Sequence, residues 1–203
     1  MESGKDRTEL VCIIDKSGSM SGYEDDTIGG FNSFIRKQKE LPGECHVTTI
    51  LFDHSLYLLH DRVDIRAMKK MTAHDYVAGG STALLDAVGM GIDKTVKYVK
   101  SIHSEFAPDH VIFFITTDGM ENASTHYSRR KIRHMISMEK EEYGWDFIFS
   151  GAGIDVKETA RDMNIDEDKA YSFERSPEGI VMNMECADKM VTGCRGTRLP
   201  CRR

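Results

Sequence analysis

The sequence contains no apolar run long enough to cross a lipid bilayer, which takes about 20 residues. Its first ten residues, MESGKDRTEL, are polar and lack the apolar segment of a secretory signal peptide. Basic residues are outnumbered, 27 to 33, by acidic ones, and the net charge of -6 disfavours nucleic-acid binding, which a basic surface usually drives. These absences predict a cytoplasmic protein with no membrane or nucleic-acid partner.

Cysteine is also scarce, with 5 in 203 residues and no C-x-x-C pair. Cys12 and Cys45 lie in or beside apolar runs, where cysteine usually acts as a small buried hydrophobic residue. The other three lie near the C-terminus. Neither the odd number nor the spacing suits a disulfide framework or a zinc site, so we expect reduced thiols.

Buried strands and amphipathic helices alternate along the chain. LVCII (10–14) and HVIFFITT (110–117) are continuous apolar runs, typical of strands covered on both faces. Between the strands expected at 45–52 and 56–63, only the three residues DHS intervene, so this pair must be antiparallel and 56–63 should be an edge strand. Further strands are expected at 145–151 and 169–173. Helices are expected at 25–40, 84–99, around Ile132–Ile136, at 154–163 and at 177–192, with a short helix and a loop in 64–78.

This alternation predicts an α/β protein: a doubly wound, mostly parallel sheet with one antiparallel edge strand and helices on both faces. The sequence shows no internal repeat and no linker. We expect one domain over residues 8–192 and a disordered tail over 193–203. Ser124 or Thr125 is the expected N-cap of the helix around Ile132–Ile136.

Polar clusters stand at the predicted ends of the strands. Asp15, Ser17 and Ser19 follow the first strand in DKSGS, and Asp118 follows the strand 110–117. Thr82, in GGST, directly precedes the long helix. Ligands of open parallel sheets bind beyond the carboxyl ends of the strands, so these side chains could meet there. Carboxylate and hydroxyl oxygens suit Mg²⁺ or Mn²⁺, although each cluster by itself could equally serve as a turn or a helix cap.

The order D-x-S-x-S, then Thr in a glycine-rich loop, then Asp-Gly resembles the von Willebrand factor type A (vWA) domain. The motif of that family is the metal-ion-dependent adhesion site (MIDAS). All five of its positions are filled here, and DKSGSM and TTDG are similar to bacterial intracellular members. The matching residues are Asp15, Ser17, Ser19, Thr82 and Asp118.

The resemblance implies a Rossmann-like domain with Mg²⁺ (or Mn²⁺) at the top of the sheet. The two serines and the threonine would bind the ion directly, and the two aspartates directly or through water. Neutral hydroxyls leave the ion under-neutralised, and an open coordination position would accept an Asp or Glu of a partner protein. The implied function is therefore a metal-dependent protein-binding module and not an enzyme.

A metal-assisted phosphatase or hydrolase with Asp15 as its nucleophile is the alternative. Ser17 stands where an Asp-x-Asp nucleophile motif has its second acid, and the sequence has no P-loop or G-x-S-x-G. Asp86, early in the long helix, is expected to favour the helix N-terminus. Other residues could line the rim of the site or only support packing and turns: Met20, Tyr23, Met120, Glu121 and Asn122.

Overall fold

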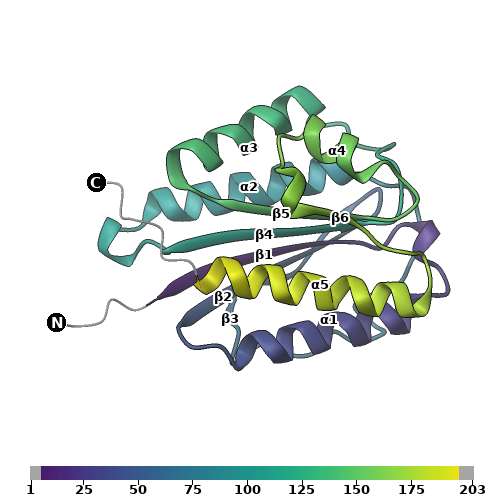
Figure 1. Cartoon of the computed structure of the whole chain (residues 1–203), viewed down its shortest axis with the longest axis horizontal. Helices are drawn as coiled ribbons and strands as arrows, with labels where there is room; N and C mark the ends of the chain where they lie inside the picture. Colours follow the sequence, from purple (N-terminus) through teal and green to yellow (C-terminus); the bar gives the residue numbers. More distant parts are fainter. Residues whose placement is uncertain (1–5, 197–203) are drawn as a thin grey trace.

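Six strands form a single sheet in the order β3-β2-β1-β4-β5-β6 (Figure 1). The computed structural model describes residues 6–196. Every neighbouring pair is parallel except β2 and β3, which confirms the antiparallel edge strand. The strands are β1 Arg7–Asp15, β2 Glu44–Phe52, β3 Leu56–Asp64, β4 His110–Thr117, β5 Asp146–Gly151 and β6 Ala170–Ser172.

Helices cover both faces of the sheet, as the alternating pattern predicted. Figure 1 shows α1 and α5 on one face and α2, α3 and α4 on the other. None of the helices within residues 6–196 is long and apolar enough to cross a membrane. The helices are α1 Glu24–Lys39, α2 Leu84–Ser101, α3 Arg129–Tyr143, α4 Val156–Asp162 and α5 Pro177–Gly196, with short 3₁₀ turns at Gly18–Met20, Ser104–Phe106 and Glu167–Lys169.

The central strands β1 and β4 explain why the sheet has two apolar faces. All eight residues of β4 are buried. Successive side chains of a strand point to opposite faces. Phe113 accordingly packs in the cluster under α2 and α3, and Phe114 packs in the cluster under α1 and α5. The continuous apolar runs seen in the sequence are therefore required by the two helical layers.

Three local expectations differ from the structure. Residues 65–83 contain turns but no helix, so the short helix expected in 64–78 is absent. The N-cap of α3 is Ser128, whose side chain accepts a hydrogen bond from Lys131 N, and not Ser124 or Thr125. Helix α5 continues to Gly196, past the expected end at residue 192, and residues 197–203 of the expected tail lie outside the described chain.

Gly89 allows the loop after β4 to lie directly on α2. A Cβ at this position would lie 2.3 Å from Cδ1 of Tyr127. We expect Gly89→Ala to lower the free energy of unfolding by about 1–3 kcal/mol, because the ring must leave its place. Urea denaturation measures this change.

Gly29→Ala is the matched control for that substitution. Gly29 is exposed on α1, and an added Cβ would meet no atom within 4 Å. This variant should gain up to about 1 kcal/mol, since alanine favours helix more than glycine does. Equal stability changes in the two variants would contradict the packing described for Tyr127.

Candidate metal centre

The five predicted ligands come together at the carboxyl end of the sheet. Asp15 is the last residue of β1, and Asp118 directly follows β4. The Oγ atoms of Ser17 and Ser19 lie 3.1 Å apart, and Ser19 Oγ donates to Asp118 Oδ1 at 2.5 Å. A Cβ on Gly119 would lie 3.4 Å from Thr82 Oγ1 and 3.6 Å from Ser19 Oγ, so the threonine hydroxyl faces the same space.

Backbone hydrogen bonds hold the two glycine-containing loops against each other. Gly18 N donates to Gly80 O at 2.9 Å, and Gly79 N donates to Lys16 O at 2.9 Å. Gly80 has φ of +73°, a left-handed conformation that favours glycine. The loop that carries the serines is thereby fixed beside the loop that carries Thr82.

Asn122 fixes the loop that follows β4. From the sequence alone, this residue could have lined the rim of the site or only shaped the turn. Its Oδ1 accepts a hydrogen bond from Thr82 N at 2.8 Å, and its own N donates to Thr82 O at 3.1 Å. Asn122 is thus a clamp between the loop after β4 and the start of α2. In the described part of the chain, the Thr82 hydroxyl itself makes no hydrogen bond.

Both aspartates are buried, with exposed fractions of 1% for Asp15 and 0% for Asp118. Burial raises the pKa of the Asp15 carboxyl, and hydrogen bonds from Thr117 and Ser17 offset part of that rise. Burial likewise raises the pKa of Asp118, while the hydrogen bond from Ser19 and the positive charge of Arg175 lower it in part. The two carboxylates repel each other, and Arg175 offsets the charge of Asp118 only, so a positive ion between them would still be favourable.

The donors fit a hard divalent cation. Adjacent ligands of octahedral Mg²⁺, each about 2.1 Å from the ion, lie about 3 Å apart, close to the spacing of the two serine oxygens. Within residues 6–196 no cluster of three or more His, Cys, Asp or Glu side chains could hold a metal. A metal at this place would therefore depend on the hydroxyls, which suit Mg²⁺ or Mn²⁺ better than zinc.

Lys16, inside the DKSGS segment, is neutralised by another residue. Its Nζ lies 2.6 Å from Oδ2 of buried Asp53, at the end of the β2 strand, and only 4.1 Å from the ring centroid of Tyr57. The ion pair joins the loop after β1 to the loop after β2. The adjacent lysine therefore adds no net charge to the site.

Arg175 is a functional candidate that sequence reasoning missed. Its Nη2 donates to the backbone O of Asp118 at 2.5 Å, and its Nε lies 3.1 Å from Asp118 Oδ2. The second contact is an ion pair without hydrogen-bond geometry, so Oδ2 has no hydrogen bond within residues 6–196. The two residues are 57 positions apart, and no local motif marks the arginine.

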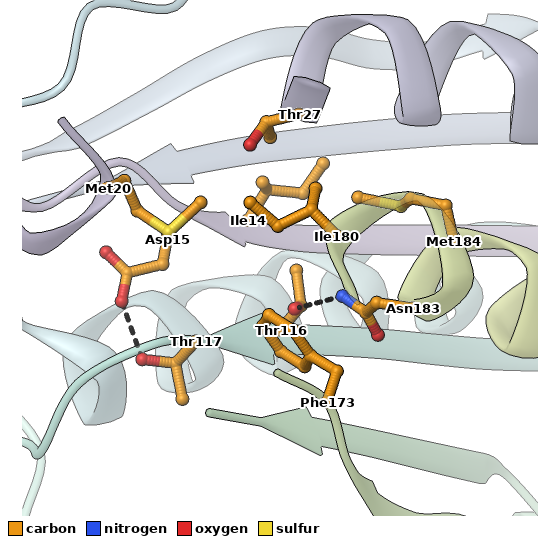
Figure 2. Close-up of a pocket in the computed structure, with 10 residues that line it drawn as sticks. All are labelled: Ile14, Asp15, Met20, Thr27, Thr116, Thr117, Phe173, Ile180, Asn183 and Met184. Atoms are coloured by element: carbon orange, nitrogen blue, oxygen red, sulfur yellow. Dashed lines mark hydrogen bonds between the residues drawn. The ribbon is translucent and has the colours of Figure 1, made fainter. Parts of the chain in front are cut away.

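A small cavity lies beneath the site, between the ends of β1 and β4 and helix α5 (Figure 2). Its volume is about 10 Å³, enough for about one water molecule. Asn183 donates to Thr116 Oγ1 at 2.9 Å on one wall, and Met20 packs on another. The cavity is too small for a ligand larger than water.

A larger groove of about 260 Å³ adjoins the site at Gly119. Leu84, Ile154 and Met163 form part of its apolar lining, and acidic residues of α4 lie along it. The exposed side chain of Met120 stands at its edge. The surface beside the candidate ligands is therefore hollowed and offers contacts for more than one side chain.

The predicted rim residues have different roles. Met20 is only 5% exposed and belongs to the packing, whereas Met120 is 69% exposed and stands on the rim. The Tyr23 hydroxyl donates to the backbone O of Arg175 at 3.1 Å. Glu121 accepts hydrogen bonds from Leu85 N, Ala123 N and Ser124 N and so shapes the turn.

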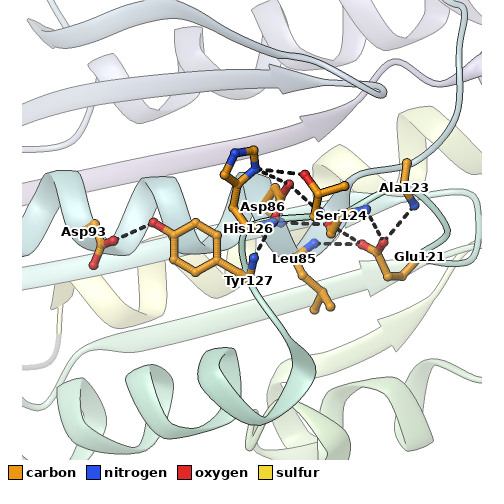
Figure 3. A network of polar contacts seen from close by, with 9 residues as sticks. Leu85, Asp86, Asp93, Glu121, Ala123, Ser124, His126 and Tyr127 are labelled. Carbon is orange, nitrogen blue, oxygen red and sulfur yellow. Dashed lines mark hydrogen bonds and ion pairs between the residues drawn. The ribbon is translucent and has the colours of Figure 1, made fainter.

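Asp86 was expected to favour the helix N-terminus, and it also anchors the loop after β4 (Figure 3). Its carboxylate accepts hydrogen bonds from the backbone N of Thr125, His126 and Tyr127, at 2.8–2.9 Å. His126 Nδ1 lies 3.1 Å from Asp86 Oδ2. The anchor holds the loop that begins with Asp118.

Comparison with known proteins supports the fold. No protein-family model matches the sequence, and no curated protein matches it. Among solved structures, the vWF domain of the type V pili tip protein from Porphyromonas gingivalis is 11% identical, with a TM-score of 0.64 over 97% of this chain and 99% of that one.

Two further structures show the same architecture. Manganese-loaded TRAP protein from Plasmodium vivax is 13% identical, with a TM-score of 0.54 over 88% of this chain and 72% of that one. Proximal thread matrix protein 1 from the mussel byssus is 14% identical, with a TM-score of 0.59 over 92% of this chain. This chain spans only 46% of the mussel protein. The chain therefore has the fold of vWA domains.

Proposed function

We propose that this chain is a metal-dependent protein-binding module with a complete MIDAS. Its Mg²⁺ or Mn²⁺ ion would be held by Ser17, Ser19 and Thr82, with Asp15 and Asp118 bound directly or through water. The observation that carries the proposal is the convergence of these five oxygen donors at one end of the sheet. The ion would recruit an Asp or Glu side chain of a partner protein through its open coordination position.

The neighbouring structures support this choice of function. One of them, TRAP, was solved with manganese, and another is the vWF domain of a pilus tip protein. A single carboxylate–metal contact is small beside the 1,200–2,000 Å² or so that specific interfaces usually bury. The groove next to Gly119 and the exposed Met120 provide additional contact surface for such a partner.

The alternative hydrolase function has less support. A nucleophilic aspartate must reach its substrate, but Asp15 is 1% exposed and both of its carboxylate oxygens accept hydrogen bonds. Turnover of a generic phosphate ester with Mg²⁺ or Mn²⁺ is the direct check. Metal-dependent activity that disappears in Asp15→Asn would favour the hydrolase over the binding module.

The proposal is tested by capturing partners on the immobilised protein from a lysate of its native host, in Mg²⁺ and in EDTA. A partner retained only with Mg²⁺ is then purified, and its exposed Asp and Glu residues are replaced one at a time by Asn and Gln. We expect EDTA to abolish binding and one such replacement to weaken it at least about tenfold. Equal affinity in Mg²⁺ and EDTA would show that the partner binds elsewhere.

A further inference from the structure

Arg175 places a fixed positive charge beside the candidate metal ligands. It lies between β6 and α5, and its side chain is 40% exposed. The Tyr23 hydroxyl holds its backbone O, and Gly153 leaves space for the guanidinium, since a Cβ there would lie 2.9 Å from Nη2. The position of Arg175 is therefore built by two other segments of the chain.

The charges around the site show what this arginine changes. With a divalent ion bound, the ion and the Asp15 and Asp118 carboxylates would have a net charge of zero, even where these carboxylates act through water and the direct ligands are neutral hydroxyls. Lys16 adds nothing, because Asp53 neutralises it at 2.6 Å. The Glu121 carboxylate is directed to backbone N–H groups at the start of α2 and of its own turn. Arg175 is thus the charge that would leave the ion and its candidate ligands positive by one unit, while Glu121 lies at the N-terminus of α2, where the helix dipole offsets part of its charge.

We propose that Arg175 is a specificity-determining residue of this site, which makes the loaded centre cationic and donates a second contact to the incoming carboxylate. This inference rests on the proposed metal-dependent binding function. A guanidinium has five N–H donors, and those not directed at Asp118 have no hydrogen-bond partner within residues 6–196. Arginine suits planar carboxylates through paired hydrogen bonds, so the ligand would contact both the ion and the arginine.

The positive charge of Arg175 must have opposite effects on the binding of the metal ion and on the binding of the carboxylate ligand. Repulsion between the guanidinium and a divalent cation weakens binding of the metal. Attraction between the guanidinium and a carboxylate strengthens binding of the ligand. An arginine that only supported the loop would strengthen both steps or neither, so the opposite signs identify the proposed role.

The test uses Arg175→Gln and two probes, Mn²⁺ alone and acetate. Calorimetry of the metal-free protein should give about tenfold tighter Mn²⁺ binding in the variant than in the wild type. Acetate titrated into the Mg²⁺-saturated protein, followed by amide NMR shifts, should bind about tenfold more weakly to the variant. Unchanged or weaker Mn²⁺ binding, or unchanged acetate binding, would overturn the inference.

Two variants complete the experiment. Arg161→Gln removes the same charge from the surface of α4, where Arg161 pairs with Glu167, and should change neither constant. Arg175→Lys keeps the positive charge but lacks the planar guanidinium. It should retain the wild-type Mn²⁺ affinity and bind acetate more weakly. If Arg175→Gln does not fold, this variant provides the test of the proposed role. Wild-type protein that binds no Mn²⁺ would instead refute the proposed function itself.

Discussion

Thr82→Ala will lower the affinity for Mg²⁺ and Mn²⁺ at least about tenfold and abolish metal-dependent partner binding. The hydroxyl faces the same space as Ser19 Oγ and makes no hydrogen bond in the described part of the chain, so its removal deprives the ion of a ligand and breaks no internal hydrogen bond. The backbone bonds between Thr82 and Asn122 do not involve the side chain and will remain. Calorimetry measures the metal affinity.

Ser81→Ala is the matched control for this prediction. Ser81 is the neighbouring residue in GGST, and its side chain is exposed. Its loss should leave metal binding, partner binding and the circular dichroism spectrum unchanged. Wild-type metal affinity in a folded Thr82→Ala protein would remove the threonine from the ligand set.

Much of the fold was predictable because the periodicity of apolar residues reflects burial. HVIFFITT was the strongest signal for a central strand, and the short DHS link permitted only an antiparallel pair; the structure has both. The end of each strand then marked where Asp15 and Asp118 would lie. The convergence of the candidate site therefore followed from the general geometry of parallel sheets.

The missed features depend on contacts between residues far apart in the sequence. Serine is a common N-cap residue, which made Ser124 a candidate. Its hydroxyl instead donates a hydrogen bond to Glu121 and accepts one from Asp86 N, and the helix begins only after Ser128. Met20 sits next to the ligand loop in sequence yet packs inward. Arg175 reaches Asp118 from a loop near the last helix, and a charge on a loop carries no sequence signal of its partner.

The hydrogen bonds from the loop after β4 to the Asp86 carboxylate should contribute strongly to the stability of the protein. Asp86→Ala should lower the free energy of unfolding by about 2–4 kcal/mol, because three backbone N–H groups lose their common acceptor. Urea denaturation gives the value. Hydrogen exchange should also become faster at residues 125–127, since these amides then lack a protein partner.

The pH dependence of stability should change with the same substitution. Burial alone raises the pKa of Asp86, but the hydrogen bonds from Thr125, His126 and Tyr127 outweigh it and lower the pKa below its usual range. A carboxyl with a lowered folded-state pKa contributes stability that is fully present above its unfolded value, about 3.9, and is lost as the pH falls through the folded-state pKa. The stability difference between wild type and Asp86→Ala should therefore shrink below about pH 4.

Asp93→Ala separates this effect from the loss of a negative charge on α2. Asp93 is exposed on the same helix and accepts one hydrogen bond, from the Tyr127 hydroxyl at 2.5 Å. Asp93→Ala should lower the free energy of unfolding by less than about 1 kcal/mol, because the Tyr127 hydroxyl and the Asp93 carboxylate can each bind water instead. Asp86→Asn, which keeps one acceptor oxygen, should fall between the two alanine variants. If Asp86→Ala and Asp93→Ala prove equally stable, Asp86 does not anchor the loop, and the position of Asp118 depends on Asn122, Arg175 and the sheet instead.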